Sequence, residues 1–156
     1  MQEIKGAKHQ SGTHQTWVRV AWLYSKGFRR FAEKLAPVGL SVAQYDLLAC
    51  LVAAEPQRLK QSDLASRLLV TKGNISGMLG RMTEQSMVKR SDDPTDRRSK
   101  RIVITEEGRA LYERGRCAQE ALIAELFGDI TGERLRLFEE VVEQLCEKFK
   151  SEEEPN

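Results

Sequence analysis

Residues 61–105 read QSDLASRLLVTKGNISGMLGRMTEQSMVKRSDDPTDRRSKRIVIT, and this stretch decides the fold of the chain. Its first half carries two apolar stripes at helical spacing, separated by a turn at Val70-Thr71. Its second half alternates apolar and polar residues in two short runs, joined by a loop that contains Pro94. The stretch therefore predicts a short helix, a turn, a second helix and a two-stranded hairpin, which is the outline of a winged helix-turn-helix.

Charge is unevenly distributed along the chain. From Arg58 to Arg101, eleven Lys and Arg stand against five Asp and Glu, a surplus of six, whereas from Ile102 onward seven bases stand against fourteen acids. The net charge of +2 thus hides a basic middle and an acidic C-terminal part. Such separation favours a polyanionic partner for the basic region alone.

Length and composition narrow the class of protein. The 156 residues, 40% of them apolar, suit one domain with a modest core. We find no apolar run long enough for a membrane span and no signal peptide, so we expect a cytoplasmic protein without a membrane partner. The three cysteines are far apart and the two histidines lie near the N-terminus, so the sequence predicts neither a metal site nor a cofactor. No catalytic set of nucleophile, base and orienting acid comes together, and an enzyme is not expected.

Helices are expected on both sides of the winged helix-turn-helix. Residues 1–12 are nearly devoid of apolar side chains and predict a mobile arm, followed by an amphipathic helix from Trp17 to about Leu35. A second helix follows the expected N-cap Ser41, and residues 57–60 suit a short strand beside the hairpin. Thr105 is expected to cap a long helix reaching about Phe127, and Thr131 a last one. Residues 151–156 form an acidic tail.

The second helix of the central stretch has two different faces. Its inward stripe is apolar, and its outward face is small, polar and basic, as a helix in a DNA major groove requires. The outward residues are Lys72, Asn74, Ser76, Gly77 and Arg81. The hairpin tip carries Asp96, Arg97, Arg98 and Lys100, where the Asp96 carboxylate could orient Arg98 toward a narrow minor groove.

With this order of elements, the chain resembles the MarR family (multiple antibiotic resistance regulators) of transcription factors. The resemblance extends from Trp17 to Phe149 and is strongest in LSVAQYDLLACL (40–51), QSDLASRLLVTKGNISGMLGRM (61–82) and DDPTDRRSKRIVITEEGRALYE (92–113). The Asp-x-Arg of the family wing falls on Asp96 and Arg98, and the Thr-x-x-Gly after it falls on Thr105 and Gly108.

The resemblance implies a mainly α fold with a small β-hairpin wing. Residues 13–40 and 106–150 would supply dimerisation helices around a DNA-binding region at 41–105. The homodimer would bind double-stranded DNA at a pseudopalindromic operator, usually as a repressor. By position, Lys72, Asn74 and Ser76 would face bases, Arg98 with Asp96 would reach the minor groove, and the phosphate-holding residues would be Gln61, Ser62, Thr71 and Arg81.

The chain is expected to use either a small aromatic or lipophilic effector or no effector at all. The resemblance implies a family-type pocket between the first, second and fifth helices, near Trp17, Trp22 and Tyr45. That these three residues simply fill the core and an interface is an equal alternative. The chain departs from the family in having Ser86-Met87 where Gly-Leu is usual, and it has no cysteine before Cys50, which argues against peroxide sensing.

A second function stays open from the sequence. The chain could be a winged-helix protein-interaction module that does not read DNA. Salt dependence separates the two, because DNA binding weakens steeply with salt as counterions are released.

Overall fold

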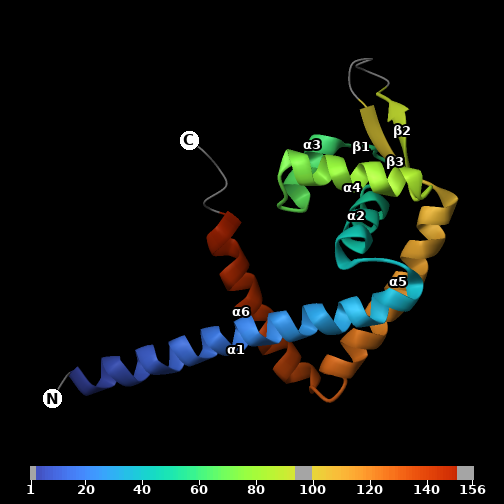
Figure 1. Ribbon diagram of the computed structural model, residues 1–156. Helices are drawn as coiled ribbons and strands as arrows, with labels where there is room; N and C mark the ends of the chain where they lie inside the picture. Colours follow the sequence, from blue (N-terminus) through green and yellow to red (C-terminus); the bar gives the residue numbers. More distant parts are fainter. Residues whose placement is uncertain (1–2, 94–99, 151–156) are drawn as a thin grey trace, which may run out of the picture. The chain divides into compact units, whose positions relative to one another are not determined.

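The computed structural model describes the backbone of residues 3–93 and 100–150 and the side chains of residues 12–93 and 100–149. It comprises two compact units, residues up to Leu122 and residues from Ile123, and each is considered by itself. The first contains a long helix, the winged helix-turn-helix and most of the fifth helix (Figure 1).

The elements follow the predicted order. In the first unit they are α1 (Glu3–Leu35), the 3-10 turn η1 (Ala36–Val38), α2 (Val42–Ala53), β1 (Leu59–Lys60), α3 (Gln61–Arg67), α4 (Lys72–Glu84), β2 (Val88–Asp92) and β3 (Lys100–Ile104). Helix α5 (Glu106–Phe127) runs into the second unit, which also holds α6 (Gly132–Lys150). The winged helix-turn-helix fold predicted from the sequence is therefore confirmed.

Three antiparallel strands form the sheet, in the order β1-β3-β2. Strand β2 pairs with β3 over five residues, from Val88↔Ile104 to Asp92↔Lys100. The expected short strand is present as β1, which pairs with β3 at Leu59↔Ile102 and Lys60↔Arg101. The wing is thus anchored on its inner edge by the segment between α2 and α3.

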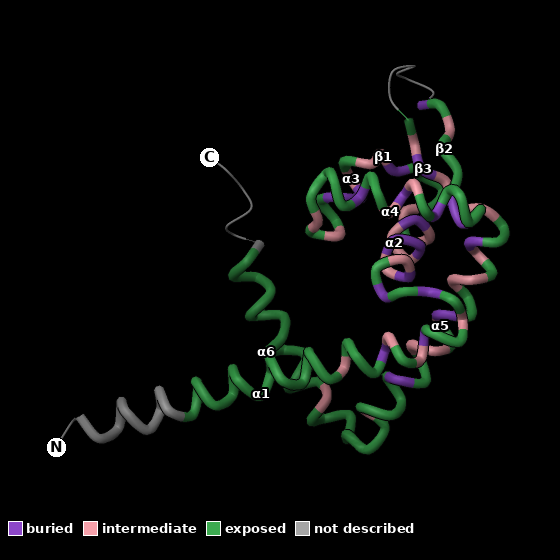
Figure 2. The backbone as a smooth tube through the Cα atoms, in the orientation of Figure 1, coloured by how far each residue is buried: buried purple, intermediate pink, exposed green. Residues whose placement is uncertain are grey.

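The core lies where α2, α4 and the sheet meet (Figure 2). Helix α2 buries Leu47 and Leu48 completely, and α4 contributes Ile75, Leu79 and Met82, each 0% exposed. Helices α2 and α4 begin at the predicted caps, because Ser41 Oγ accepts from Gln44 N at 3.2 Å and Thr71 Oγ1 accepts from Asn74 N at 3.3 Å. Thr105 likewise caps α5, accepting from Gly108 N at 3.0 Å.

Two local predictions are wrong. Helix α1 begins at Glu3 rather than near Trp17, because nothing between Glu3 and Leu35 breaks a helix, and a helix can continue without an apolar stripe. Whether residues 1–12 are mobile stays a prediction. The apolar spacing at residues 62–69 predicts a helix that buries Leu69. Instead Leu69 is 84% exposed with φ +52°, because the chain leaves the helix there in a left-handed turn.

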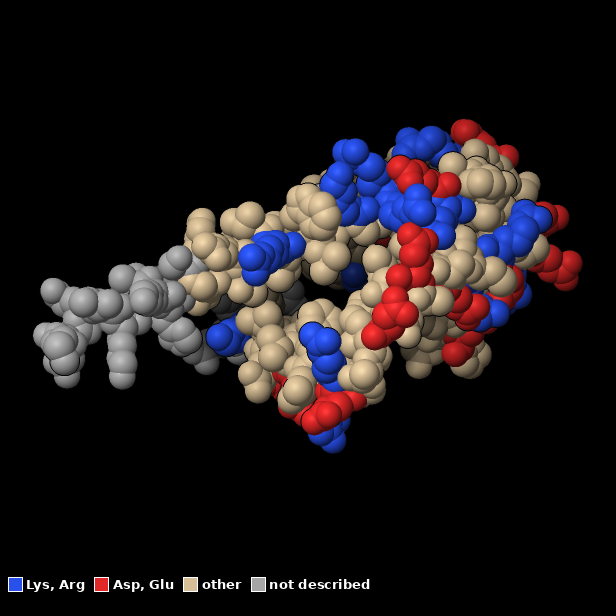
Figure 3. Space-filling model, turned by 90° about the horizontal axis from the view of Figure 1, so that it is seen from below, with Lys and Arg blue, Asp and Glu red and all other residues tan. Residues whose placement is uncertain are grey.

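Apolar side chains on α1 and α6 lie on the surface of their own units. On α1, Trp17 is 69% and Tyr24 71% exposed, and on α6 Phe149 is 69% exposed. Figure 3 shows broad uncharged areas beside the undescribed N-terminal residues, between scattered basic side chains. Among the described residues, no single helix is both long and apolar enough to span a membrane. Gly12–Val38 and α2, which meet at an 81° bend, reach the required length and apolar content only when they are taken together, and α2 is a buried core helix.

Candidate nucleic-acid interface

Helix α4 presents a polar and basic surface opposite its buried stripe. Lys72, Asn74, Ser76 and Arg81 are all exposed, on the side predicted from the sequence. Thr71 is also exposed, and its hydroxyl is engaged as the N-cap of the helix. The structure therefore brings the five predicted residues of this helix and its cap onto one continuous solvent-facing surface.

Glycines occupy the middle of that outward surface. Gly73, Gly77 and Gly80 are spaced four and three residues apart, so they follow one stripe of the helix. An added Cβ at Gly73 or Gly80 would meet nothing within 4 Å, and at Gly77 only the tip of Arg81 at 3.7 Å. Packing within the protein therefore does not require glycine here, although each interior glycine costs roughly 0.5–1 kcal/mol relative to alanine. Of these three glycines, only Gly77 was predicted from the sequence to lie on the outward face.

Two further predicted residues lie at the start of α3. Ser62 is exposed and Gln61 is half-buried. The Ser62 hydroxyl donates to Asp63 Oδ1 at 3.2 Å, while Asp63 Oδ2 accepts from Lys60 N at 3.0 Å. Asp63 thus fixes the first turn of α3 to β1 and orients Ser62 at the same time.

The predicted wing-tip residues are described only in part. Asp96, Arg97 and Arg98 lie outside the described residues. Lys100 is exposed on β3 and pairs with the carboxylate of Asp92 across the hairpin. Lys89 and Arg90 add two exposed basic side chains on β2.

A buried carboxylate at the loop end of β2 was missed by sequence reasoning. Asp93 is 2% exposed, and its Oδ2 lies 2.7 Å from Arg101 Nε and 3.8 Å from Lys60 Nζ. One side chain thus links the end of β2 to β3 and to β1. In the sequence, Asp92-Asp93 looks like a solvated pair before a turn, and only the register of the three strands distinguishes them.

The joint between α4, the wing and α5 is closely packed. Ser86 lies just after α4, at the position where the resembled family usually has glycine. Its φ of +58° is in the left-handed region. Thr105 Oγ1 lies 2.5 Å from Ser86 O and 3.0 Å from Met87 O. A Cβ at Gly108 would stand 2.0 Å from Met87 O, so only glycine allows the first turn of α5 to pack against the backbone of Met87.

The predicted effector residues are not all in one place within the protomer. Tyr45 is 2% exposed in the core, stacked on Tyr112 with ring centroids 5.6 Å apart, and donates its hydroxyl to Gln119 Oε1 at 2.8 Å. Burial, with a contribution from Tyr112, raises the pKa of Tyr45 to about 12, so its hydroxyl stays a donor. Trp17 and Trp22 are 69% and 61% exposed.

The described residues also include side chains of the kinds used in metal and thiol chemistry. No group of three or more His, Cys, Asp or Glu side chains there could hold a metal ion. Cys50 is half-buried, and burial raises the pKa of its thiol, which lowers the fraction of reactive thiolate.

Comparison with known proteins gives consistent results. The MarR family profile matches residues 38–99. The HTH-type transcriptional regulator PrsX of Escherichia coli is 32% identical over 114 residues, which cover 73% of this chain and 69% of PrsX. Among solved structures, a mutant MarR of Escherichia coli complexed with operator DNA has a TM-score of 0.72 at 24% identity, covering 81% of this chain and 89% of that one. CouR of Rhodococcus jostii RHA1, bound to p-coumaroyl-CoA, has a TM-score of 0.69 at 26% identity, covering 88% and 90%.

Proposed function

The chain belongs to the MarR family of transcriptional regulators, and we propose that it is a homodimeric repressor that binds a pseudopalindromic operator. The observation that carries this proposal is the glycine stripe of α4, flanked by the exposed Lys72, Asn74 and Arg81. A surface without side chains at its centre and with donors at its margins fits a major groove, where the helix must come close to base edges.

Each element has a separate role in the proposed complex. Lys72, Asn74 and Ser76 face the bases, and Gln61, Ser62, Thr71 and Arg81 hold the flanking phosphates. Arg98 enters the adjacent minor groove, braced by Asp96, with Arg97 and Lys100 beside it. Asp93 supports this proposal by fixing the loop end of β2 to β3 and β1.

Dimerisation is inferred from the exposed apolar stripes. Trp17, Tyr24 and Phe28 on α1 and Leu145 and Phe149 on α6 are each at least 49% exposed in the single chain. Exposed apolar stripes of this kind mark interfaces, and a second copy of the chain would cover them on a two-fold axis. Two recognition helices would then reach half-sites about 34–36 Å apart.

The proposed regulator responds to a small aromatic or lipophilic effector. CouR, at 26% identity, was solved with p-coumaroyl-CoA. Trp17 and Trp22 are exposed whereas Tyr45 is buried, so a site near the two tryptophans needs the second protomer to enclose it.

The test is selection of bound duplexes from a random DNA pool, followed by affinity measurement. We expect Arg98→Ala to lower operator affinity by about 1–3 kcal/mol with little change in the thermal midpoint. Arg114→Ala, on the exposed face of α5, is the matched control and should leave affinity unchanged. Operator affinity should fall steeply with added salt. A chain that selects no duplex, or is monomeric in solution, favours the protein-interaction module instead.

A further inference from the structure

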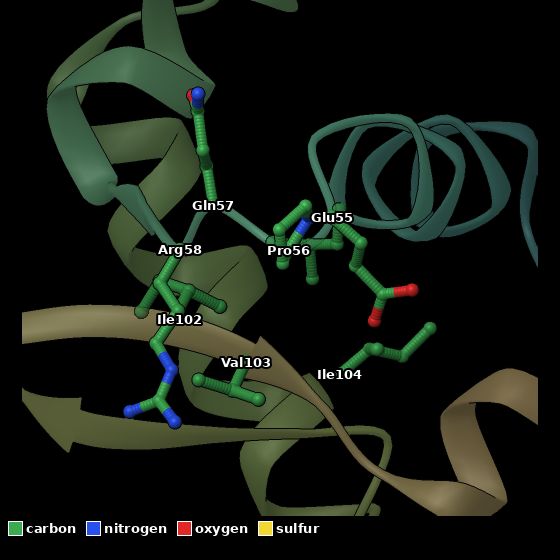
Figure 4. A pocket seen from close by; sticks show the side chains of 8 residues that line it. Glu55, Pro56, Gln57, Arg58, Ile102, Val103 and Ile104 are labelled. Carbon is green, nitrogen blue, oxygen red and sulfur yellow. The ribbon is translucent and has the colours of Figure 1, made fainter.

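Leu69, in the turn between α3 and α4, is the most exposed large apolar side chain among the described residues. It is 84% exposed, whereas its neighbours Leu68 and Val70 are partly buried and pack against the core. It does not line the cavity between the end of α2 and β3, whose lining includes residues 55–58 and 102–104 (Figure 4). The described part of the chain therefore leaves the Leu69 side chain open to solvent.

The backbone of Leu69 is fixed by the way in which α3 ends. Val70 N donates to Ala65 O at 3.0 Å, and Leu69 N donates to Ser66 O at 3.2 Å. These two hydrogen bonds form a Schellman motif, which places a left-handed residue at Leu69, and the φ of Leu69 is +52°. Glycine is the usual residue at this position, because a side chain on a left-handed backbone is unfavourable.

Exposure and backbone conformation together make Leu69 unusual. A single exposed leucine is ordinary on a protein surface. A leucine that is exposed and also holds a left-handed backbone contributes little to the fold, since glycine at the same position would be less strained. Strained positions of this kind cluster at functional sites, so the side chain points to a contact outside the chain.

The turn that carries Leu69 leads directly into the proposed recognition helix. Thr71, two residues later, is the N-cap of α4, and Lys72 and Asn74 in its first turn are exposed. When a helix-turn-helix binds DNA, the N-terminal residues of the second helix contact base edges, and the first helix crosses the backbone. Leu69 connects these two helices, so we expect it at the rim of the groove that α4 enters.

The chemistry of the major groove limits what an apolar side chain can recognise there. Base edges present hydrogen-bond donors and acceptors, and their apolar group is the C5 methyl of thymine. Cytosine lacks this methyl group, so an apolar contact at this point distinguishes a T·A pair from a C·G pair. Lys72 and Asn74 offer hydrogen bonds and do not detect a methyl group.

We propose that Leu69 contacts the methyl group of one thymine in each operator half-site and thereby helps to determine which sequence is bound. The inference rests on the proposed DNA binding and adds to it a residue that reads sequence by apolar contact. It also predicts that duplexes selected from a random pool carry thymine at one fixed position of each half-site. Leu69→Gly should lose this preference in the same selection.

The test uses the full chain and the duplex that it selects. Each thymine of one half-site is replaced in turn by deoxyuridine, which keeps the base pair and removes only the methyl group. We expect one of these replacements to weaken binding by the parent protein roughly fourfold, the effect of burying one methyl group. The same replacement should leave the affinities of Leu69→Ala and Leu69→Gly unchanged.

Two controls separate this contact from an effect on folding. Leu69→Gly removes the left-handed strain and should raise the urea unfolding midpoint, so its loss of methyl sensitivity would not reflect a weaker fold. Ser66→Ala changes an exposed side chain in the last turn of α3 and should keep the methyl sensitivity of the parent protein.

Several outcomes would overturn the inference. One is a selected duplex in which no thymine methyl affects binding, and another is equal methyl sensitivity in the parent and both Leu69 variants. A third is an affinity loss in Leu69→Ala that is the same for thymine and deoxyuridine duplexes, because the contact would then be with the DNA backbone. DNA binding with any of these results leaves the proposed function standing, whereas a chain that selects no duplex refutes both.

Discussion

The backbone of Gly115 on α5 lies directly against the ring of Tyr45 on α2. A Cβ at position 115 would stand 2.6 Å from Tyr45 Cδ2 and 3.2 Å from Leu35 Cδ2. The ring is fixed on its other sides, because it stacks on Tyr112 and meets Phe31 edge-on at 5.2 Å between centroids. The contact joins α1, α2 and α5, and so connects the winged helix-turn-helix to the helices that flank it.

Gly115→Ala should destabilise the protein by about 1–3 kcal/mol, because the added methyl overpacks a site with no room to yield. Gly12→Ala is the control: nothing lies within 4 Å of its Cβ position, and replacing a helical glycine there should be neutral or stabilising. Urea unfolding of both variants measures the difference. Equal unfolding midpoints for the two would show that Tyr45 moves aside at no cost.

Asp93 and Asp92 are neighbours with opposite environments, and Asn at each position should have different effects. Asp93→Asn removes a buried charge from Arg101 and Lys60 and should cost up to about 3–5 kcal/mol, reduced by the partial exposure of both partners. Asp92→Asn breaks an exposed pair with Lys100 and should cost at most about 1 kcal/mol. Thermal unfolding tests this order. Operator affinity should also fall more for Asp93→Asn, and a reversed order would contradict the anchoring role.

Replacing a glycine of α4 by alanine should raise the stability of the fold and weaken DNA binding. Gly77→Ala is expected to stabilise the fold by roughly 0.5–1 kcal/mol, because the space outside is open. The same methyl should weaken operator binding by keeping the helix from the groove. Gly73→Ala should act alike, and Gly12→Ala on α1 should stabilise without weakening binding. If both α4 variants kept the operator affinity of the parent protein, the main support for a close approach of α4 to the DNA would be lost.

Ser86 carries a backbone conformation that suits glycine better. At φ +58° a non-glycine residue is strained by roughly 1–2 kcal/mol, so Ser86→Gly should raise stability by up to that amount. Its carbonyl still accepts from Thr105, because that bond uses the backbone alone. Calorimetry measures whether Ser86→Gly is more stable than the parent protein. Ser25→Gly, in helix α1, is the control and should be destabilised. A loss of stability on Ser86→Gly would contradict the strain.

Asp46 should make stability depend on pH in a direction fixed by its burial. Burial raises the pKa of its carboxyl above the ordinary value, so the folded state holds the proton more tightly than the unfolded state. The contribution of Asp46 to the free energy of unfolding is complete when the pH is below the pKa of this carboxyl in the unfolded state. It is lost as the pH rises through the pKa of the same carboxyl in the folded state. Asp46→Asn should therefore be more stable than the parent at neutral pH, and the advantage should shrink in acid. Urea unfolding of Asp46→Asn and the parent protein, from neutral to acidic pH, measures this difference in stability. An advantage that grows in acid would contradict a pKa raised by burial.

Much of the fold and part of the site follow from the sequence alone. The caps Ser41, Thr71 and Thr105 and the stripe of Ile75, Leu79 and Met82 depend on residues three or four positions away, so local pattern is enough to predict them. The exposed face of α4 follows for the same reason, since whatever lies opposite a buried stripe faces solvent.

Tertiary structure alone decided the rest. Asp93 is buried and Asp92 exposed because strand register brings Lys60 and Arg101 to one of them. Tyr45 meets Gly115 across seventy residues, and the described β1 pairs with β3 over two residues. These features depend on which distant segments pack together, and the free energy of that packing is shared by the whole core, so no local pattern in the chain encodes them.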